Sequence, residues 1–146
     1  MAAIKSYTDL EQSKKLAKIL PLSSADVIWD LTNPDLPTIR AIPYEDSDYN
    51  NKYLNIIAAW SLAALLNLLP SEFTEKGKYS ETTYEIDICK YALTEDVDLY
   101  QIAYGNYKFH EDGNSSWKDM INTGEKENLI DAAFDMICWL KENEKI

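Results

Sequence analysis

The chain has 146 residues, of which 46% are hydrophobic and 12% aromatic, and its formal net charge is -11. This length suits one domain with one core, and the apolar content separates the chain from disordered sequences of similar charge. We therefore expect a single domain over residues 1–146. The acidic excess repels nucleic-acid phosphates and anionic lipid, so direct nucleic-acid binding is not expected.

The negative charge is concentrated in the second half of the chain. Residues 1–73 carry 6 basic and 9 acidic side chains, net -3, whereas residues 74–146 carry 8 and 16, net -8. Such a field steers basic partners toward the surface, or it simply keeps a small domain soluble. Both interpretations stay open at this point.

The sequence predicts a cytoplasmic protein that does not enter a membrane. Residues 1–20 mix lysines with acidic residues and contain no apolar run typical of a signal peptide. The longest apolar segment, 53–69, is interrupted by polar residues and is shorter than the ~20 residues that a spanning helix needs. Cys89 and Cys138 are the only cysteines, and without a signal peptide we expect two reduced thiols.

The first helix is predicted near residues 9–20. Thr8 and Glu11 have the spacing of a capping box, in which two side chains satisfy backbone N–H groups at a helix start. Pro21 is expected to help end this helix.

The segment from residue 21 to residue 51 is rich in Pro, Asp, Ser and Asn, which predicts mostly irregular structure. Two short apolar pieces, 27–29 and 38–42, are candidates for edge strands, because edges tolerate neighbouring prolines.

The apolar segment 53–69 ends at Pro70, and leucines at helical spacing predict a buried helix over 61–69. Ser61 is a suitable N-cap for this helix. Residues 53–60 would then be extended or loop-like; the alternative is one longer helix through the whole segment.

Residues 82–91 and 99–109 predict an antiparallel hairpin, since apolar and polar side chains alternate along each. One face of the first strand would carry Tyr84, Ile86 and Ile88, and the other face Glu85 and Asp87. In the second strand, the side chains expected on one face are those of Tyr100, Ile102 and Tyr104.

The clearest amphipathic helix is predicted near 126–142, with Phe134 in the middle of its apolar face. Together these elements predict an α+β fold. In it, a small antiparallel sheet built on the hairpin 82–91/99–109 packs against the helices near 9–20, 61–69 and 126–142.

Catalytic and metal-binding motifs are hard to assemble from this sequence. His110 is the only histidine, which limits histidine-based triads and metal sites. Residues 46–50 copy the first ligands of an EF-hand loop, but Asn51 replaces the required Gly and Ile57 replaces the closing Glu. The four glycines form no phosphate-binding loop.

We therefore assign no catalytic residue, metal, cofactor or small-molecule ligand. Asp131 and Asp135 share a helix face, as paired catalytic carboxylates must, but a solvated polar face explains them equally well.

Trp139 is the one residue that we single out as a partner contact. It lies five residues after Phe134, about 200° around the helix, which turns its indole away from the expected core. Such a Trp anchors another chain, or it packs under a loop such as 112–123.

Two segments, Ala59–Pro70 (AWSLAALLNLLP) and Asn128–Ile137 (NLIDAAFDMI), resemble blocks in small uncharacterised proteins of gut bacteria and of their phages or mobile elements. The order of helix block, hairpin and helix block is similar too, from about Trp60 to Glu142. Those proteins often have Pro where this chain has Ala59. The resemblance implies an α+β fold and a mobile-element setting, and it carries no activity, cofactor or site.

These observations favour a non-enzymatic accessory or protein-binding protein of a phage or mobile element, acting through a protein partner or through self-association. One alternative is an acidic DNA mimic, which clustering of the carboxylates at 95–98 and 111–112 on one face would favour. The other is a hydrolase that uses carboxylates converging in a concave pocket.

Overall fold

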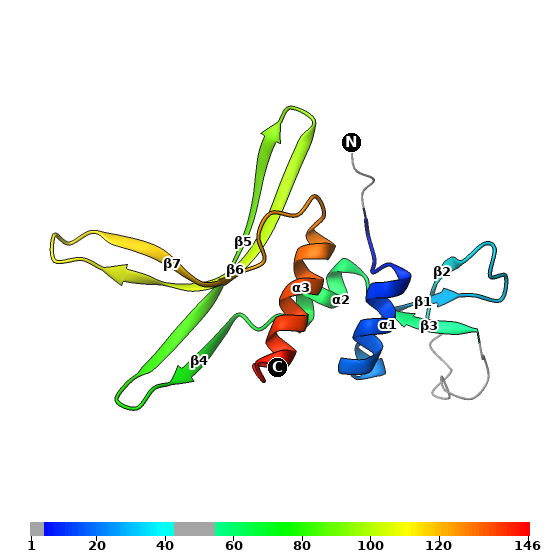
Figure 1. Ribbon diagram of the computed structural model, residues 1–146, viewed down its shortest axis with the longest axis horizontal. Coiled ribbons are helices and arrows are strands. Elements are labelled where there is room, and N and C mark those ends of the chain that lie inside the picture. Colours follow the sequence, from blue (N-terminus) through cyan, green and yellow to red (C-terminus); the bar gives the residue numbers. More distant parts are fainter. Residues whose placement is uncertain (1–4, 43–54) are drawn as a thin grey trace. The chain divides into compact units, whose positions relative to one another are not determined.

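The computed structural model describes residues 5–42 and 55–146, which group into two compact units. The N-terminal unit comprises residues 5–68 and the C-terminal unit residues 69–146 (Figure 1). Helices and two antiparallel sheets confirm the predicted α+β class. The expectation of a single domain over residues 1–146 stays a prediction.

The N-terminal unit packs one helix against a three-stranded antiparallel sheet. Its elements in chain order are α1 (Leu10–Ile19), the 3-10 helix η1 (Leu22–Ser24), β1 (Val27–Asp30), β2 (Thr38–Ala41), β3 (Ile56–Ala59) and α2 (Leu62–Leu68). The strand order is β2-β1-β3, and α1 packs against β3.

The interpretation of residues 27–29 as an edge strand is wrong, because β1 is the central strand of this sheet. Its Val27 pairs with Ala41 on one side and with Ala59 on the other. The prolines of this region do not interfere, since Pro34 and Pro37 lie in the connection after β1. The second piece is an edge strand as predicted, β2.

Helix α1 starts one residue later than predicted. The capping box consists of Asp9 and Gln12: the Gln12 N–H donates to Asp9 Oδ1 at 2.8 Å, and the Asp9 N–H donates to Gln12 Oε1 at 3.2 Å. Thr8 does not cap the helix because its hydroxyl is buried and bonded elsewhere. At the other end the Leu20 N–H bonds to the Leu16 carbonyl.

Helix α2 confirms the start at Ser61. The Ser61 hydroxyl accepts the Ala64 N–H at 3.2 Å, as an N-cap does. Residues 56–59 are a strand, so the alternative of one long helix is wrong.

The C-terminal unit is a four-stranded antiparallel meander with one helix. Its elements are β4 (Glu72–Lys76), β5 (Glu81–Thr94), β6 (Val97–Phe109), β7 (Ser115–Asn122) and α3 (Leu129–Glu142), and the strand order is β4-β5-β6-β7. Strands β5 and β6 confirm the predicted hairpin and its faces, since Ile86 lies opposite Tyr104 and Ile88 opposite Ile102. Strands β4 and β7 were not predicted.

Helix α3 packs against β6 and starts at Leu129, three residues after the predicted start. Lys126 cannot join the helix because its N–H and C=O groups both bond to Tyr100, at 2.8 and 2.7 Å. Phe134, which was expected in the middle of the buried apolar face, is half-buried. The fully buried large side chains of α3 are those of Ile130, Met136, Ile137 and Leu140.

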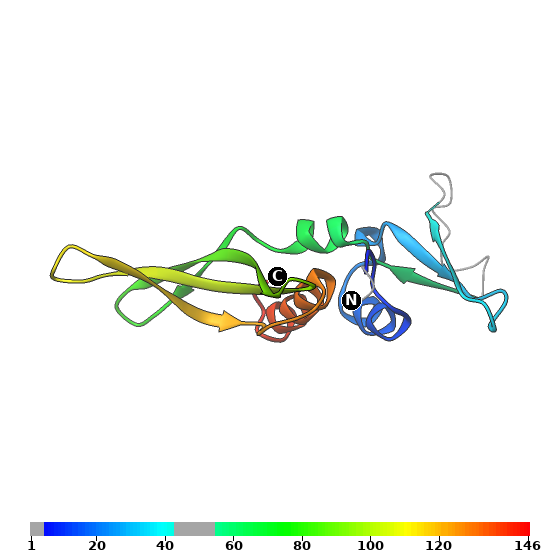
Figure 2. The same ribbon diagram turned by 90° about the horizontal axis from the view of Figure 1, so that it is seen from above.

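The strands of this unit are much longer than its helix. Both α3 and β5 have 14 residues, which corresponds to roughly 21 Å of helix and roughly 46 Å of strand. The ends of the hairpins therefore extend beyond α3 (Figures 1 and 2).

Replacing Ile137 by Ala removes a fully buried side chain from the contact side of α3. We expect the free energy of unfolding to fall by about 2–5 kcal/mol, as measured by urea denaturation. The control Glu142→Ala, at an exposed position of the same helix, should stay within about 0.5 kcal/mol of the wild type. Equal effects of the two substitutions would contradict this packing.

Candidate functional site

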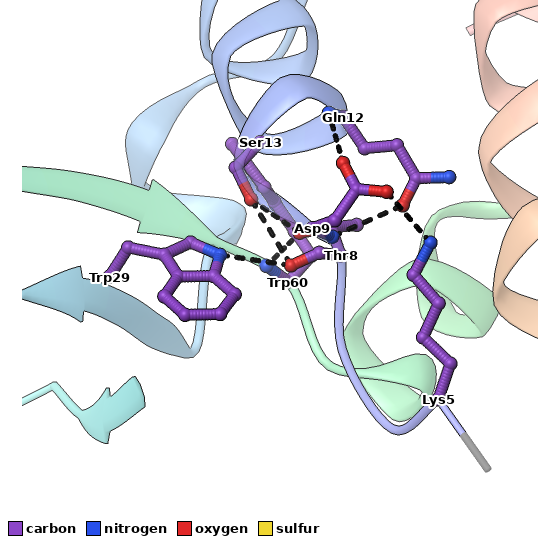
Figure 3. A network of polar contacts seen from close by, with 7 residues as sticks. All are labelled: Lys5, Thr8, Asp9, Gln12, Ser13, Trp29 and Trp60. Atoms are coloured by element: carbon purple, nitrogen blue, oxygen red, sulfur yellow. Dashed lines mark hydrogen bonds and ion pairs between the residues drawn. The ribbon is translucent and has the colours of Figure 1, made fainter. Parts of the chain in front are cut away.

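A buried polar cluster joins the start of α1 to the end of β3 (Figure 3). The hydroxyls of Thr8 and Ser13 are fully buried and lie 2.7 Å apart. The Thr8 N–H donates to the Trp60 carbonyl at 2.9 Å, and the Thr8 hydroxyl accepts the Trp60 N–H at 3.2 Å. The indole N–H of Trp29 donates to the Thr8 carbonyl at 3.0 Å.

The edge of this cluster is charged. Lys5 Nζ lies 2.9 Å from Asp9 Oδ2. Burial raises the pKa of Asp9, but the Gln12 N–H and the Lys5 ammonium outweigh burial, so the pKa of Asp9 is below its usual value.

The cluster is part of the packed interior, since both of its hydroxyls are buried and hydrogen-bonded. A nucleophilic hydroxyl needs an adjacent base and access for a substrate. The two hydroxyls of Thr8 and Ser13 bond to each other, to the Trp60 N–H and to the Thr8 carbonyl, and neither is exposed.

The described residues that were considered for chemistry lie on separate elements, His110 in a turn and Asp131 and Asp135 on α3. His110 lies on the exposed β6–β7 turn, 2.8 Å from Ser116 Oγ. Asp135 forms an ion pair with Lys126 at 2.7 Å. In the ranges 5–42 and 55–146, no group of three or more His, Cys, Asp or Glu residues has a geometry that holds a metal. The EF-hand-like residues 46–51 lie outside the described residues, and Ile57 lies in β3.

The acidic groups at 95–98 and 111–112 lie at opposite ends of β6, with Asp98 inside the strand and the others beyond it. At ~3.3 Å per residue, that strand separates them by about 40 Å. They do not form the one cluster that a DNA mimic was expected to present.

Trp139 packs beside β4. Its ring centroid lies 6.3 Å from that of Phe73, whose ring also contacts Tyr84 and Tyr104. The indole is half-buried. The partner contact at Trp139 stays a prediction, and the neighbour of the ring is β4 rather than the loop 112–123.

The sheet of the C-terminal unit has a second face, opposite the one on which Phe73 meets Trp139. Cross-strand register places Glu72 opposite Glu85, Glu85 opposite Gly105, and Gly105 opposite Asp119. Directly opposed residues share a face, so these four positions form one row across all four strands. We call this surface the acidic-aromatic face; its side chains are those of Glu72, Glu85, Asp87, Tyr107, Phe109, Trp117 and Asp119.

The aromatic part of this face lies on the β6–β7 hairpin. Tyr107 is 58% exposed and Phe109 is 84% exposed. Tyr107 meets Trp117 edge-to-face, with ring centroids 5.3 Å apart. Exposed aromatic groups of this kind are typical of interfaces.

Gly105 lets the Trp117 indole lie across β6. A Cβ atom at position 105 would come within 2.8 Å of two ring carbons of Trp117 and within 2.3 Å of the Lys118 carbonyl oxygen. The Trp117 Nε1–H donates to Asp119 Oδ1 at 2.6 Å. The aromatic and acidic parts of the face are thereby connected.

Four carboxylates of this face are not neutralised by an ion pair, although Lys76 and Glu81 pair farther along the same face. In the part of the chain that the structure describes, no Lys or Arg forms an ion pair with Glu72, Glu85, Asp87 or Asp119. Cys89 Sγ donates to Asp87 at 3.0 Å. This hydrogen bond, burial, and the charges of Asp87 and Asp119 raise the pKa of the Cys89 thiol, as expected beside negative charge.

No protein-family model, curated protein or solved structure matches this chain. The fold and the surfaces described above are therefore the basis for assigning a function. Over the described residues, no helix has the length and apolar character needed to cross a membrane.

Part of this face could be predicted from the sequence. Alternation along β5 placed Glu85 and Asp87 on the side away from Ile86. It missed Trp117 and Asp119, because β7 has little alternation and its register with β6 is what brings them beside Gly105 and Tyr107. The signal available was the run of Gly105, Tyr107 and Phe109 at alternate positions.

Thr8→Val tests the role of the buried cluster. The substitution removes the side-chain partner of the Trp60 N–H and one of the two partners of the Ser13 hydroxyl, which should lower the free energy of unfolding by about 1–3 kcal/mol. Thr8→Ser keeps the hydroxyl and should lose less. Urea denaturation followed by Trp fluorescence measures both, and a Val variant as stable as the Ser variant would contradict the structural role.

Glu85→Lys tests the like-charged pair of the acidic-aromatic face. Opposed carboxylates at positions 72 and 85 repel, so we expect the substitution to raise the free energy of unfolding by roughly 0.2–1 kcal/mol. Glu81→Lys is the matched control, because it makes the same charge change opposite Lys76, with which Glu81 is paired. That control should destabilise the protein, and a stability change of the same sign in both variants would refute the register argument.

Proposed function

We propose that this chain is a non-enzymatic protein-binding protein that contacts its partner through the β6–β7 hairpin and the acidic-aromatic face. The observation that carries the proposal is the exposure of Tyr107 and Phe109 beside Trp117. Large aromatic groups left in water at one place on a sheet are the usual anchors of protein interfaces.

The rest of the C-terminal unit supports the same function. Its exposed large apolar side chains all lie on the sheet or its turns, and they are Tyr79, Ile88, Leu93, Tyr107 and Phe109. Long hairpins that extend beyond α3 provide the contact area, while the helix supplies the core. We also propose a cytoplasmic location, and a mobile-element setting that rests on the resemblance of the two helix blocks.

The other functions have less support. A DNA mimic needs rows of carboxylates at a helical spacing on one face, and the groups at 95–98 and 111–112 are separated by the length of β6. A carboxylate hydrolase needs acids that converge, and Asp135 is instead paired with Lys126.

The double variant Tyr107→Ser/Phe109→Ser tests this function. Both side chains are exposed, so the melting temperature should stay close to that of the wild type. The wild-type chain, tagged and expressed in cells of its source organism, should co-purify with a defined partner that the double variant loses, because hot-spot aromatics carry most of the binding energy.

The control is Leu36→Ser, which removes an exposed apolar side chain of the N-terminal unit and should keep the partner. Retention of the same partner by the double variant, or the absence of any specific partner, would refute the function proposed here.

A further inference from the structure

The acidic-aromatic face has a charge pattern that specifies its partner. Glu72, Glu85 and Asp119 are exposed, and they share one row with Gly105, whose missing side chain leaves Trp117 lying across β6. Negative groups therefore occupy one part of the face, and aromatic rings occupy the adjoining hairpin.

The carboxylates on this face are unfavourable for folding. Glu72 and Glu85 are directly opposed, and like charges in that arrangement destabilise a sheet. Elsewhere on the same sheet the acids have partners: Glu75 pairs with Lys145, and Asp98 pairs with Lys90. An arrangement that weakens the free protein is expected where a ligand uses the charges.

The electrostatic field around this face is also negative. Residues 69–146 hold 8 basic and 17 acidic side chains, a net charge of -9 for this unit. A second copy of the chain would bring the same charges to the face and be repelled, whereas a basic partner would be attracted from a distance.

We infer that the acidic-aromatic face binds a basic, extended segment of another protein, with Lys or Arg side chains on the carboxylates and further groups on Tyr107, Phe109 and Trp117. This inference rests on the proposed function and adds the chemistry of the partner. The row from Glu72 to Asp119 crosses three strand spacings, about 14 Å, which about four residues of extended chain cover. Arg suits both parts of the face, because it pairs with carboxylates and stacks on aromatic rings.

The test uses the full chain and synthetic peptides. A fluorescein-labelled peptide of alternating Arg and Ser, about eight residues long, is titrated with the protein, and binding is followed by fluorescence anisotropy. Peptides of alternating Glu and Ser, and of Gly and Ser, are the negative probes. We expect binding of the Arg peptide alone, weakened by added salt.

Two matched variants separate a specific face from general charge attraction. The face variant is Glu72→Gln/Glu85→Gln/Asp119→Asn, and the control is Glu95→Gln/Asp96→Asn/Glu144→Gln, which removes the same number of exposed charges elsewhere. The face variant should bind the Arg peptide at least about tenfold more weakly, and the control less than about twofold. The face variant should melt close to the wild type, because the relieved Glu72–Glu85 repulsion offsets the weaker hydrogen bonds that Asp119→Asn makes with the Trp117 and Asn122 side chains.

Equal weakening by both variants would show that binding follows net charge only and would overturn the inference. So would failure of the wild type to bind the Arg peptide, or a sedimentation experiment showing a dimer that the face variant dissociates. If Tyr107→Ser/Phe109→Ser loses the cellular partner while the face variant binds the peptide normally, the proposed function survives and the basic partner does not. If the aromatic variant keeps its cellular partner, the proposed function itself fails.

Discussion

A residue in a strand advances the chain about twice as far as a residue in a helix, and the C-terminal unit depends on this difference. Its helix α3 and its longest strand contain the same number of residues. The helix buries its apolar side chains against the middle of the sheet, including Ile102 and Tyr104, which are fully buried. In the described residues of this unit, α3 is the only helix, and it is shorter than β5 and β6. The ends of the hairpins are therefore exposed to solvent.

The side chains on the two faces of the sheet consequently have different roles. One face carries Phe73, Tyr104 and Ile102 and provides the core with α3. The opposite face carries carboxylates and exposed aromatics beside the buried Ala103 and Leu99. This division allows the second face to keep charges that repel each other, since the core does not depend on them.

Local patterns in the sequence were sufficient for the elements with strong periodicity. Alternation along β5 and β6 gave their pairing and faces, and the apolar run before Pro70 gave α2 and its cap at Ser61. Two errors came from contacts that are distant along the chain. Thr8 was expected to cap α1, but it bonds to Trp60, 52 residues later. Lys126 was expected in α3, but it bonds to Tyr100.

The candidate site was harder to predict than the fold, for a related reason. Strands β4 and β7 contain few apolar residues, so their positions follow from pairing with β5 and β6 and not from their own pattern. Without that pairing, Glu72, Asp119 and Trp117 are ordinary surface residues of the sequence. Whether these residues share a face depends on the register between neighbouring strands, which side-chain alternation in a single strand does not specify.

Gly105 also couples the aromatic part of the acidic-aromatic face to its acidic part. The Trp117 ring lies where a side chain at position 105 would project, and its indole N–H donates to the Asp119 carboxylate. The positions of the ring and of the charge therefore both depend on the absence of a side chain at Gly105. A methyl group there would press on the ring and also on the Lys118 carbonyl oxygen, 2.3 Å away, so the β7 backbone would have to shift with them. The smallest residue of the sheet is therefore the point at which a single substitution would change the ring, the charge and the β6–β7 pairing together.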